Sequence, residues 1–199
     1  PNYIVRVSAT TKKNKEAEFI QIDELDVINE GLITRALYIN ENVGNDTKLE
    51  NEHEYLLDLA LEKQKAIRKE YKNNSISVNP LIIIQVPSKS DELIEQIETL
   101  LDNKGYSYKN KTVAIWLADR KENIENISEN DAEPIILIMK QAISTGWDCP
   151  RAKILVKLRE GGSEDFQIQT IGRIRRMPER KHYGKDTLDK LNIQKIEKD

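Results

Sequence analysis

Two apolar stretches decide the fold: LIIIQV at residues 81–86 and IILIM at residues 135–139. Successive side chains of a strand point to opposite faces, and both stretches are apolar at odd and at even positions. Strands of this kind belong to parallel sheets that are covered on both faces. Shorter β-branched runs predict further strands at residues 4–7, 33–39, 112–117 and 154–158.

Helical patterns lie between these strands. Ser90 is placed to cap a helix over residues 91–103, whose leucines and isoleucines share one face and which Gly105 ends. A longer helix is predicted near residues 52–71, with acidic residues early and basic residues late, as the helix dipole favours. The alternation of strands and helices predicts an α/β domain with a parallel sheet flanked by helices.

The composition excludes several classes of protein. The 199 residues include 31 basic and 34 acidic side chains, for a formal net charge of −3. No apolar run approaches the ~20 residues of a membrane helix, and no signal peptide opens the chain, so we expect a cytoplasmic protein without membrane contact. The single cysteine, Cys149, excludes a disulfide scaffold and a cysteine-cluster metal site, and we expect no metal ligands.

The first chemical motif is QTIGRIRR at residues 169–176, which reads QxxGRxxR on a predicted helix. Arg173 and Arg176 are three residues apart, a spacing that places both guanidinium groups on one helical face. Gly172 allows a ligand or another backbone to come close. Paired arginines suit a polyphosphate because each offers a planar fork of donors and keeps its charge.

The second motif is STGWDCP at residues 144–150, which follows the strand at 135–139. We therefore expect it at the carboxyl edge of the sheet, where open α/β sheets bind ligands. Gly146 permits close backbone approach, and Asp148 can accept a hydrogen bond from a sugar hydroxyl. Cys149 is interpreted as a buried small residue and not as a nucleophile, because no histidine lies near it in the sequence.

Charge is unevenly distributed along the chain. Residues 151–185, which include the arginine motif, hold ten Lys/Arg and four Asp/Glu, a local charge of +6. Residues 119–133 have a local charge of −4. A basic stretch is often only a solvated face, but its overlap with the motif favours binding to phosphates.

The two motifs, in this order, resemble motifs V and VI of superfamily 2 helicases and translocases. SAT at residues 8–10 resembles motif III, and PLIIIQVP at 80–87 resembles motif IV. KQAISTGWDCPRA at 140–152 and ELDVINEGLITR at 24–35 most resemble the motor (Res) subunit of type III restriction enzymes. The resemblance implies a second RecA-like lobe, which closes over ATP bound to a first lobe.

The resemblance also implies roles for single residues at the nucleotide. Arg176 would be the arginine finger on the γ-phosphate, with Arg173 beside it and Gln169 orienting both. Gly146 and Asp148 would contact nucleotide or link to the arginine motif, where Gly172 would lie close to the nucleotide.

Other residues are matched to the nucleic acid. Lys140 and Thr145 fall where related motors contact the nucleic-acid backbone. Ser8 and Thr10 would couple the nucleotide state to the strand-binding face. The implied partners are double-stranded DNA and the modification (methyltransferase) subunit of the restriction complex.

The chain lacks two elements of the family. It contains no GxxxxGK[ST] phosphate loop and no DEAD- or DEAH-like tetrapeptide, both of which precede Ser8 in the family order. ATP and Mg²⁺ would therefore be bound mainly by the missing first lobe. The whole protein would be an ATP-dependent translocase and site-specific endonuclease, whose nuclease would follow this chain.

The resemblance divides the chain into four parts. They are residues 1–50, the end of the first lobe and an inter-lobe segment; 51–75, a connecting helix; 76–185, the RecA-like lobe; and 186–199, a tail. Three alternatives stay open: a superfamily 2 repair or remodelling helicase without a nuclease, a stand-alone nucleic-acid-binding module, and a metabolic nucleotide-binding α/β protein. The last has no glycine fingerprint after a strand to support it.

The missing phosphate loop yields a direct prediction. The purified 199-residue chain should show no ATPase activity, with or without DNA, because it supplies only the arginine side of a nucleotide site. A coupled ATPase assay measures this. Turnover above roughly 1 s⁻¹, within the usual range for enzymes, would contradict the prediction.

Overall fold

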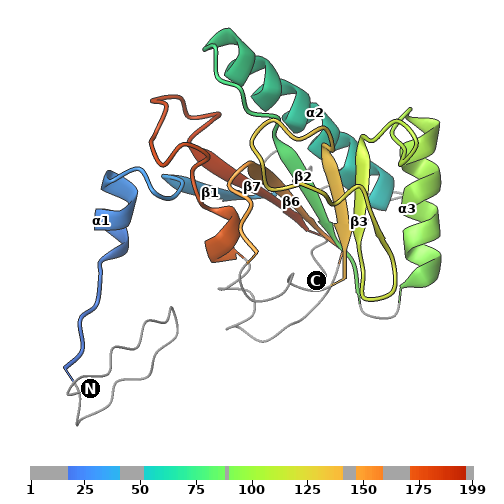
Figure 1. Ribbon diagram of the computed structural model, residues 1–199, viewed down its shortest axis with the longest axis horizontal. Helices are drawn as coiled ribbons and strands as arrows, with labels where there is room; N and C mark the ends of the chain where they lie inside the picture. The colour runs from blue at the N-terminus through green and yellow to red at the C-terminus, as the bar shows by residue number, and fades with distance from the viewer. Residues whose placement is uncertain (1–17, 41–51, 88–89, 141–146, 159–170, 196–199) are drawn as a thin grey trace.

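The structure is a computed structural model of the chain, and it describes residues 18–40, 52–87, 90–140, 147–158 and 171–195. These residues form one sheet with helices packed against it (Figure 1). The strands are β1 (Ala36–Ile39), β2 (Leu81–Gln85), β3 (Val113–Trp116), β4 (Lys121–Glu122), β5 (Ile136–Met139), β6 (Ala152–Lys157) and β7 (Lys190–Lys195). The helices are α1 (Glu24–Asn29), α2 (Glu52–Asn73) and α3 (Asp91–Asn103).

The seven described strands lie in the order β1-β7-β6-β2-β5-β3-β4. Every neighbouring pair is parallel except β3 and β4, which form an antiparallel hairpin at one edge. All residues of β2 and β5 are buried, as their unbroken apolar sequences require. The predicted α/β class, a parallel sheet flanked by helices, is confirmed.

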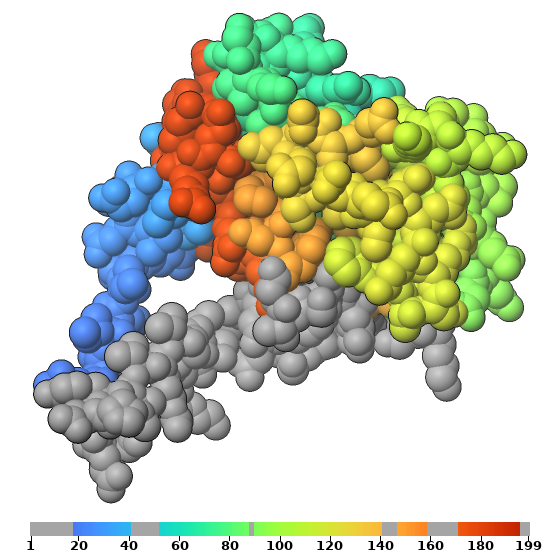
Figure 2. Space-filling model, in the orientation of Figure 1, coloured from blue at the N-terminus to red at the C-terminus, as the bar shows by residue number. Residues whose placement is uncertain are grey.

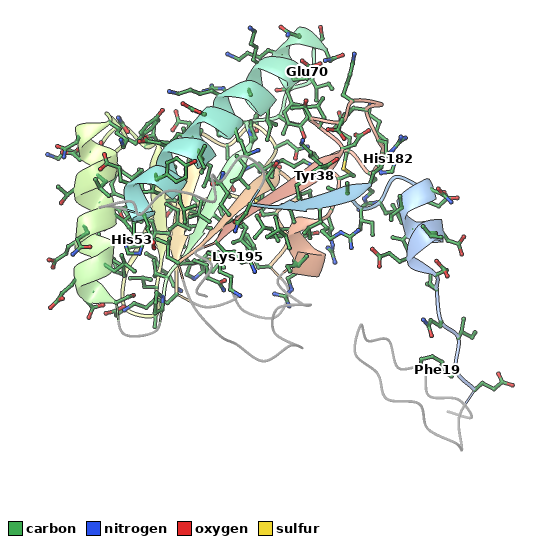
Figure 3. The ribbon with its side chains drawn as sticks, turned by 180° about the vertical axis from the view of Figure 1, so that it is seen from behind. Phe19, Tyr38, His53, Glu70, His182 and Lys195 are labelled. Atoms are coloured by element: carbon green, nitrogen blue, oxygen red, sulfur yellow. The ribbon has the colours of Figure 1, made fainter. Side chains whose placement is uncertain are left out.

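The two faces of the sheet are covered in different ways. Helices α2 and α3 pack on one face of the sheet, the face that is turned toward the viewer in Figure 3. They bury alternate residues of the central strands, among them Ile82, Ile84 and Ile138. Trp147, Cys149, Ile171 and Ile174 pack on the opposite face with Ile83 and Leu137. The second layer is therefore built by the segments that carry the two sequence motifs.

Helix α3 has the bounds that its sequence predicts, from Asp91 to Asn103. Gly105 follows with a φ of +81°, a left-handed conformation that glycine adopts without strain. Ser90 stands at the N-cap, but its hydroxyl donates to the Pro87 carbonyl at 2.7 Å and does not cap the helix. The Ser90 side chain therefore closes the turn before α3, and Asp91 and Glu92 provide the negative charge in its first turn.

The sheet extends beyond residues 76–185, the range expected for the lobe. Strand β1 lies in the expected inter-lobe segment, and β7 lies in the expected tail, where it pairs with both β1 and β6. The alternation of Leu191 and Ile193 with polar residues is the sequence signal for β7. The strand expected at residues 4–7 lies outside the described residues. Among the helices that are described, none is both long enough and apolar enough to cross a bilayer.

Arg151 joins three loops at the amino edge of the sheet. It is fully buried directly before β6. Its Nε donates to the Ile127 carbonyl at 2.7 Å, and one guanidinium nitrogen donates to the carbonyls of Asn79 and Pro134 at 2.8 and 2.9 Å. These carbonyls precede β2 and β5 or lie in the loop that leads to β5. A single buried cation thus satisfies backbone groups that would otherwise be left without donors.

Arg151→Ala should lower the free energy of unfolding by about 3 kcal/mol or more, because three buried carbonyls lose a charged donor. Urea denaturation at neutral pH measures the loss. Arg68→Ala, at an exposed position on α2, is the matched control and should change stability by no more than about 0.5 kcal/mol. Equal effects at the two positions would show that Arg151 does not hold these loops.

Candidate functional site

Arg176 lies just beyond the end of a helical stretch that includes Ile171 and Ile174. Its backbone is extended and forms an isolated antiparallel bridge with Ile33, in the segment that leads into β1. The expectation that Arg173 and Arg176 share one helical face is therefore wrong, since only Arg173 is helical. Pairing with a distant segment overrides the helical spacing of the motif.

The side chains of Asp148 and Arg176 form an ion pair, in which the guanidinium donates to Asp148 Oδ2. Both side chains remain accessible, with exposed fractions of 40% for Asp148 and 51% for Arg176. Asp148 Oδ1 and the neighbouring Trp147 Nε1 are buried, and neither has a hydrogen-bond partner among the residues that the structure describes. The structure thus brings together the two motifs that the sequence singled out, and it leaves unused polar groups beside their contact.

The described part of the second motif, residues 147–150, does not lie at the carboxyl edge, where it was expected. Trp147 and Cys149 pack on the second face of the sheet, and the chain then reaches the amino end of β6. Cys149 is buried, its thiol contacts the Ile127 carbonyl at 3.6 Å, and burial raises its pKa to about 11. Its interpretation as a buried small residue is confirmed.

The structure also describes three other predicted site residues, Gly172, Arg173 and Lys140. Gly172 is exposed, and a Cβ built on it would meet no atom within 4 Å, so a ligand has room there. Arg173 is partly exposed on the same helical stretch. Lys140 follows β5, and its ammonium is 2.7 Å from the carboxylate of Asp91 at the start of α3. Contact between Lys140 and a phosphate would therefore compete with Asp91.

Five predicted residues lie outside the described residues, and their roles stay predictions. They are Gln169, Gly146, Thr145, Ser8 and Thr10.

Arg175 is a residue of this site that the sequence did not indicate. One of its guanidinium nitrogens is 2.6 Å from the Glu24 carboxylate on α1, and the other donates to the Thr34 carbonyl at 3.3 Å. Glu24 is 151 residues away in the sequence, so no local pattern could have revealed the contact. Arg175 holds α1 and the segment after it against the arginine motif.

Several cations of the basic stretch at residues 151–185 are not available at the surface. Arg151 and Lys153 are completely buried, and Arg175 is neutralised by Glu24. Lys153 lies where the register of β6 against β2 shifts, since Ala152 pairs with Leu81 and Ile154 with Ile82. Its ammonium is 3.4 Å from the sulfur of Met177, directly after the arginine motif. Burial lowers the pKa of Lys153 to about 7.

The groups present fit one side of a nucleotide site. An accessible guanidinium and an open glycine suit a phosphate. Within the described part of the chain, no group of three or more His, Cys, Asp or Glu side chains could hold a metal ion.

No protein-family model and no curated protein matches the chain. Matches among solved structures include the C-terminal part of the Fun30 ATPase domain, at 15% sequence identity and a TM-score of 0.43. They also include the C-terminal domain of S. cerevisiae Dbp5 bound to Gle1 and IP6, at 17% identity and a TM-score of 0.38. The first match covers 74% of this chain and 43% of the Fun30 chain, and the second covers 69% and 70%. The chain thus spans less than half of the Fun30 chain.

Lys153→Met should stabilise the fold at pH 7 by about 2–4 kcal/mol, because it removes an ammonium that folding partly deprotonates. The folded-state pKa of about 7 lies below the ordinary 10.5, so the unfolded chain binds more protons between these values. Wild-type stability should therefore rise relative to the variant above pH 7, and the difference should shrink by about 1.4 kcal/mol per pH unit.

Urea denaturation of both proteins at pH 7, 8 and 9 measures this difference. Lys65→Met, at an exposed position on α2, is the control and should show the same pH dependence as the wild type. If the difference in unfolding free energy between wild type and Lys153→Met stays constant with pH, the pKa of Lys153 is not lowered in the folded protein.

Proposed function

We propose that this chain is the second motor lobe of a superfamily 2 helicase or translocase, in which Arg176 acts as an arginine finger. The observation that carries the proposal is the ion pair between Asp148 and Arg176. It joins the GWDCP and QTIGRIRR motifs, which are the most specific elements of the resemblance. The pair also leaves both side chains accessible, as a residue that has to meet a nucleotide requires.

Arg176 would act on the charge that develops when the γ-phosphate is transferred. Its guanidinium keeps its positive charge at any working pH and offers five N–H donors. Asp148 accepts one of these donors in a solvent-accessible pair that a polyphosphate can displace. ATP held with Mg²⁺ on the first lobe would supply the reacting phosphoryl group. The chain's own contribution is electrostatic: it places a positive charge where the transition state needs it.

The more specific proposal is the motor subunit of a type III restriction enzyme. It is supported by the sequences at residues 140–152 and 24–35. In this proposal the whole protein translocates on double-stranded DNA, works with a methyltransferase subunit and carries a nuclease after this lobe. Lys140 and Thr145 would face the DNA backbone, and Gly146, Gly172, Arg173 and Gln169 would surround the nucleotide. Ser8 and Thr10 would couple the two sites.

The stand-alone nucleic-acid-binding module is the weaker alternative. It depends on a basic surface at residues 151–185, but two of these cations are buried and a third is neutralised by Glu24. The cations that remain include Arg173 and Arg176 on the arginine motif. The burial of Arg151 and Lys153 leaves fewer cations to follow a nucleic-acid backbone. A repair or remodelling helicase lobe without a nuclease would use the same site, and only the sequence after the lobe separates it from a restriction motor.

Arg176→Ala in the complete motor should lower kcat for ATP hydrolysis on the order of 10³-fold, while the KM for ATP changes little. The reason is that an arginine finger meets charge that is present mainly in the transition state. Steady-state ATPase kinetics in the presence of DNA measure both constants. Thermal melts should show little change, because Arg176 is half exposed and its bridge to Ile33 is made by backbone groups.

The control for this experiment is Arg68→Ala, an exposed arginine on α2 far from the motif in the sequence. Arg175 is unsuitable as a control, since its side chain bonds Glu24 and Thr34. If Arg176→Ala retains the wild-type kcat, or loses activity only through unfolding, Arg176 is not an arginine finger and the proposed function fails.

A further inference from the structure

The segment that leads from α1 to β1 is bonded to both sides of Arg176. The Thr34 amide donates to the Arg175 carbonyl at 2.7 Å, and the Met177 amide donates to the Leu32 carbonyl at 3.0 Å. Figure 2 shows the two regions side by side, with residues 18–40 in blue and 171–195 in red. The backbone of Arg176 therefore lies between two hydrogen bonds to the same segment and cannot shift independently of it.

The Arg175 side chain reinforces this connection from the other direction. It bridges the Glu24 carboxylate on α1 and the carbonyl of Thr34, a fully buried residue. Arg175 itself is only 18% exposed, whereas Glu24 is 62% exposed. The Arg175 side chain is thus largely buried in its place, and α1 is attached to it through the more exposed Glu24.

A second set of contacts fixes the far side of the segment. Arg35 donates to His182 Nδ1 at 3.0 Å, and His182 Nε2 lies 2.8 Å from the Ile33 carbonyl (Figure 3 labels His182). The Arg35 amide also donates to the Asp189 carbonyl at 2.8 Å. Gly31 packs so closely that a Cβ there would lie 2.8 Å from the Cα of Lys181. Backbone-on-backbone packing of this kind transmits a displacement and does not absorb it.

We propose that Arg175 is a positioning residue, which couples movement of α1 and the following segment to the placement of Arg176. The inference rests on the proposed function, since it assigns a task to Arg175 only if Arg176 is a finger. In such a motor, α1 and its segment form the connection through which the lobe is joined to the preceding one. A change in the relative position of the lobes is then conveyed to the finger through Glu24, Arg175 and the bridge at Ile33.

The first experiment measures the connection in the 199-residue chain itself. Hydrogen exchange at the Thr34 and Met177 amides should be faster in Arg175→Gln and in Glu24→Gln than in the wild type, by roughly fivefold or more. Asp26→Asn removes a charge from the same helix at an exposed position and should leave both rates unchanged. Equal rates in all four proteins would overturn the inference.

The second experiment measures coupling to catalysis in the complete motor. Glu24→Gln and Arg175→Gln should each lower kcat roughly fivefold with little change in KM for ATP. The double variant should lose no more than either single variant, because both remove the same contact. Arg175→Lys, which keeps a cationic donor for Glu24, should retain more of the wild-type kcat than Arg175→Gln, a difference that simple destabilisation would not give.

The outcomes separate this inference from the function on which it rests. If Arg176→Ala lowers kcat but the Glu24 and Arg175 variants match Asp26→Asn, the finger stands and the coupling is refuted. Additive losses in the double variant, or an Arg175→Lys protein no more active than Arg175→Gln, also refute the coupling. If Arg176→Ala has no effect on kcat, the proposed function and this inference fail together.

Discussion

The burial of β2 on both faces is the constraint on which the rest of the structure depends. All five of its residues are inaccessible to water, so each face of the sheet needs a covering layer. Helices α2 and α3 provide one layer, and the segments around Trp147 and Ile174 provide the other. Because the second layer is made of these segments, the hydrophobic effect that stabilises the sheet also holds Asp148 and Arg176 on a common face.

The sequence predicts the features that local chemistry decides. The apolar runs of β2 and β5 specify a parallel sheet, and the pattern of α3 together with Gly105 gives its bounds. The resemblance assigns the two motifs to one nucleotide site, and the ion pair between Asp148 and Arg176 joins them. The sequence could not show that Arg176 leaves the helix, because the cause is a bridge to Ile33, far away in the chain. The contact between Glu24 and Arg175 is hidden for the same reason.

The net charge of residues 151–185 overstates the positive charge at the surface, because two of the cations are buried. Arg151 is fully inaccessible, yet its Nε and one guanidinium nitrogen donate to three carbonyls from two loops. Lys153 is equally buried, but its ammonium contacts the sulfur of Met177, a weak acceptor, and burial lowers its pKa to about 7. Both residues belong to a stretch whose composition predicts a phosphate-binding surface. Whether a cation serves the fold or a ligand is decided by its position relative to the sheet, which composition does not contain.

The two contacts of Arg176 differ in strength, and the difference suits a finger. Its ion pair with Asp148 is accessible to solvent, and pairs of this kind contribute only about 0–1 kcal/mol to stability. A polyphosphate carries several negative charges and can displace a single carboxylate from the guanidinium at small cost. The backbone of Arg176, in contrast, is fixed by hydrogen bonds on both sides to the segment before β1. The side chain is therefore free to change partners, while its point of attachment moves only with that segment.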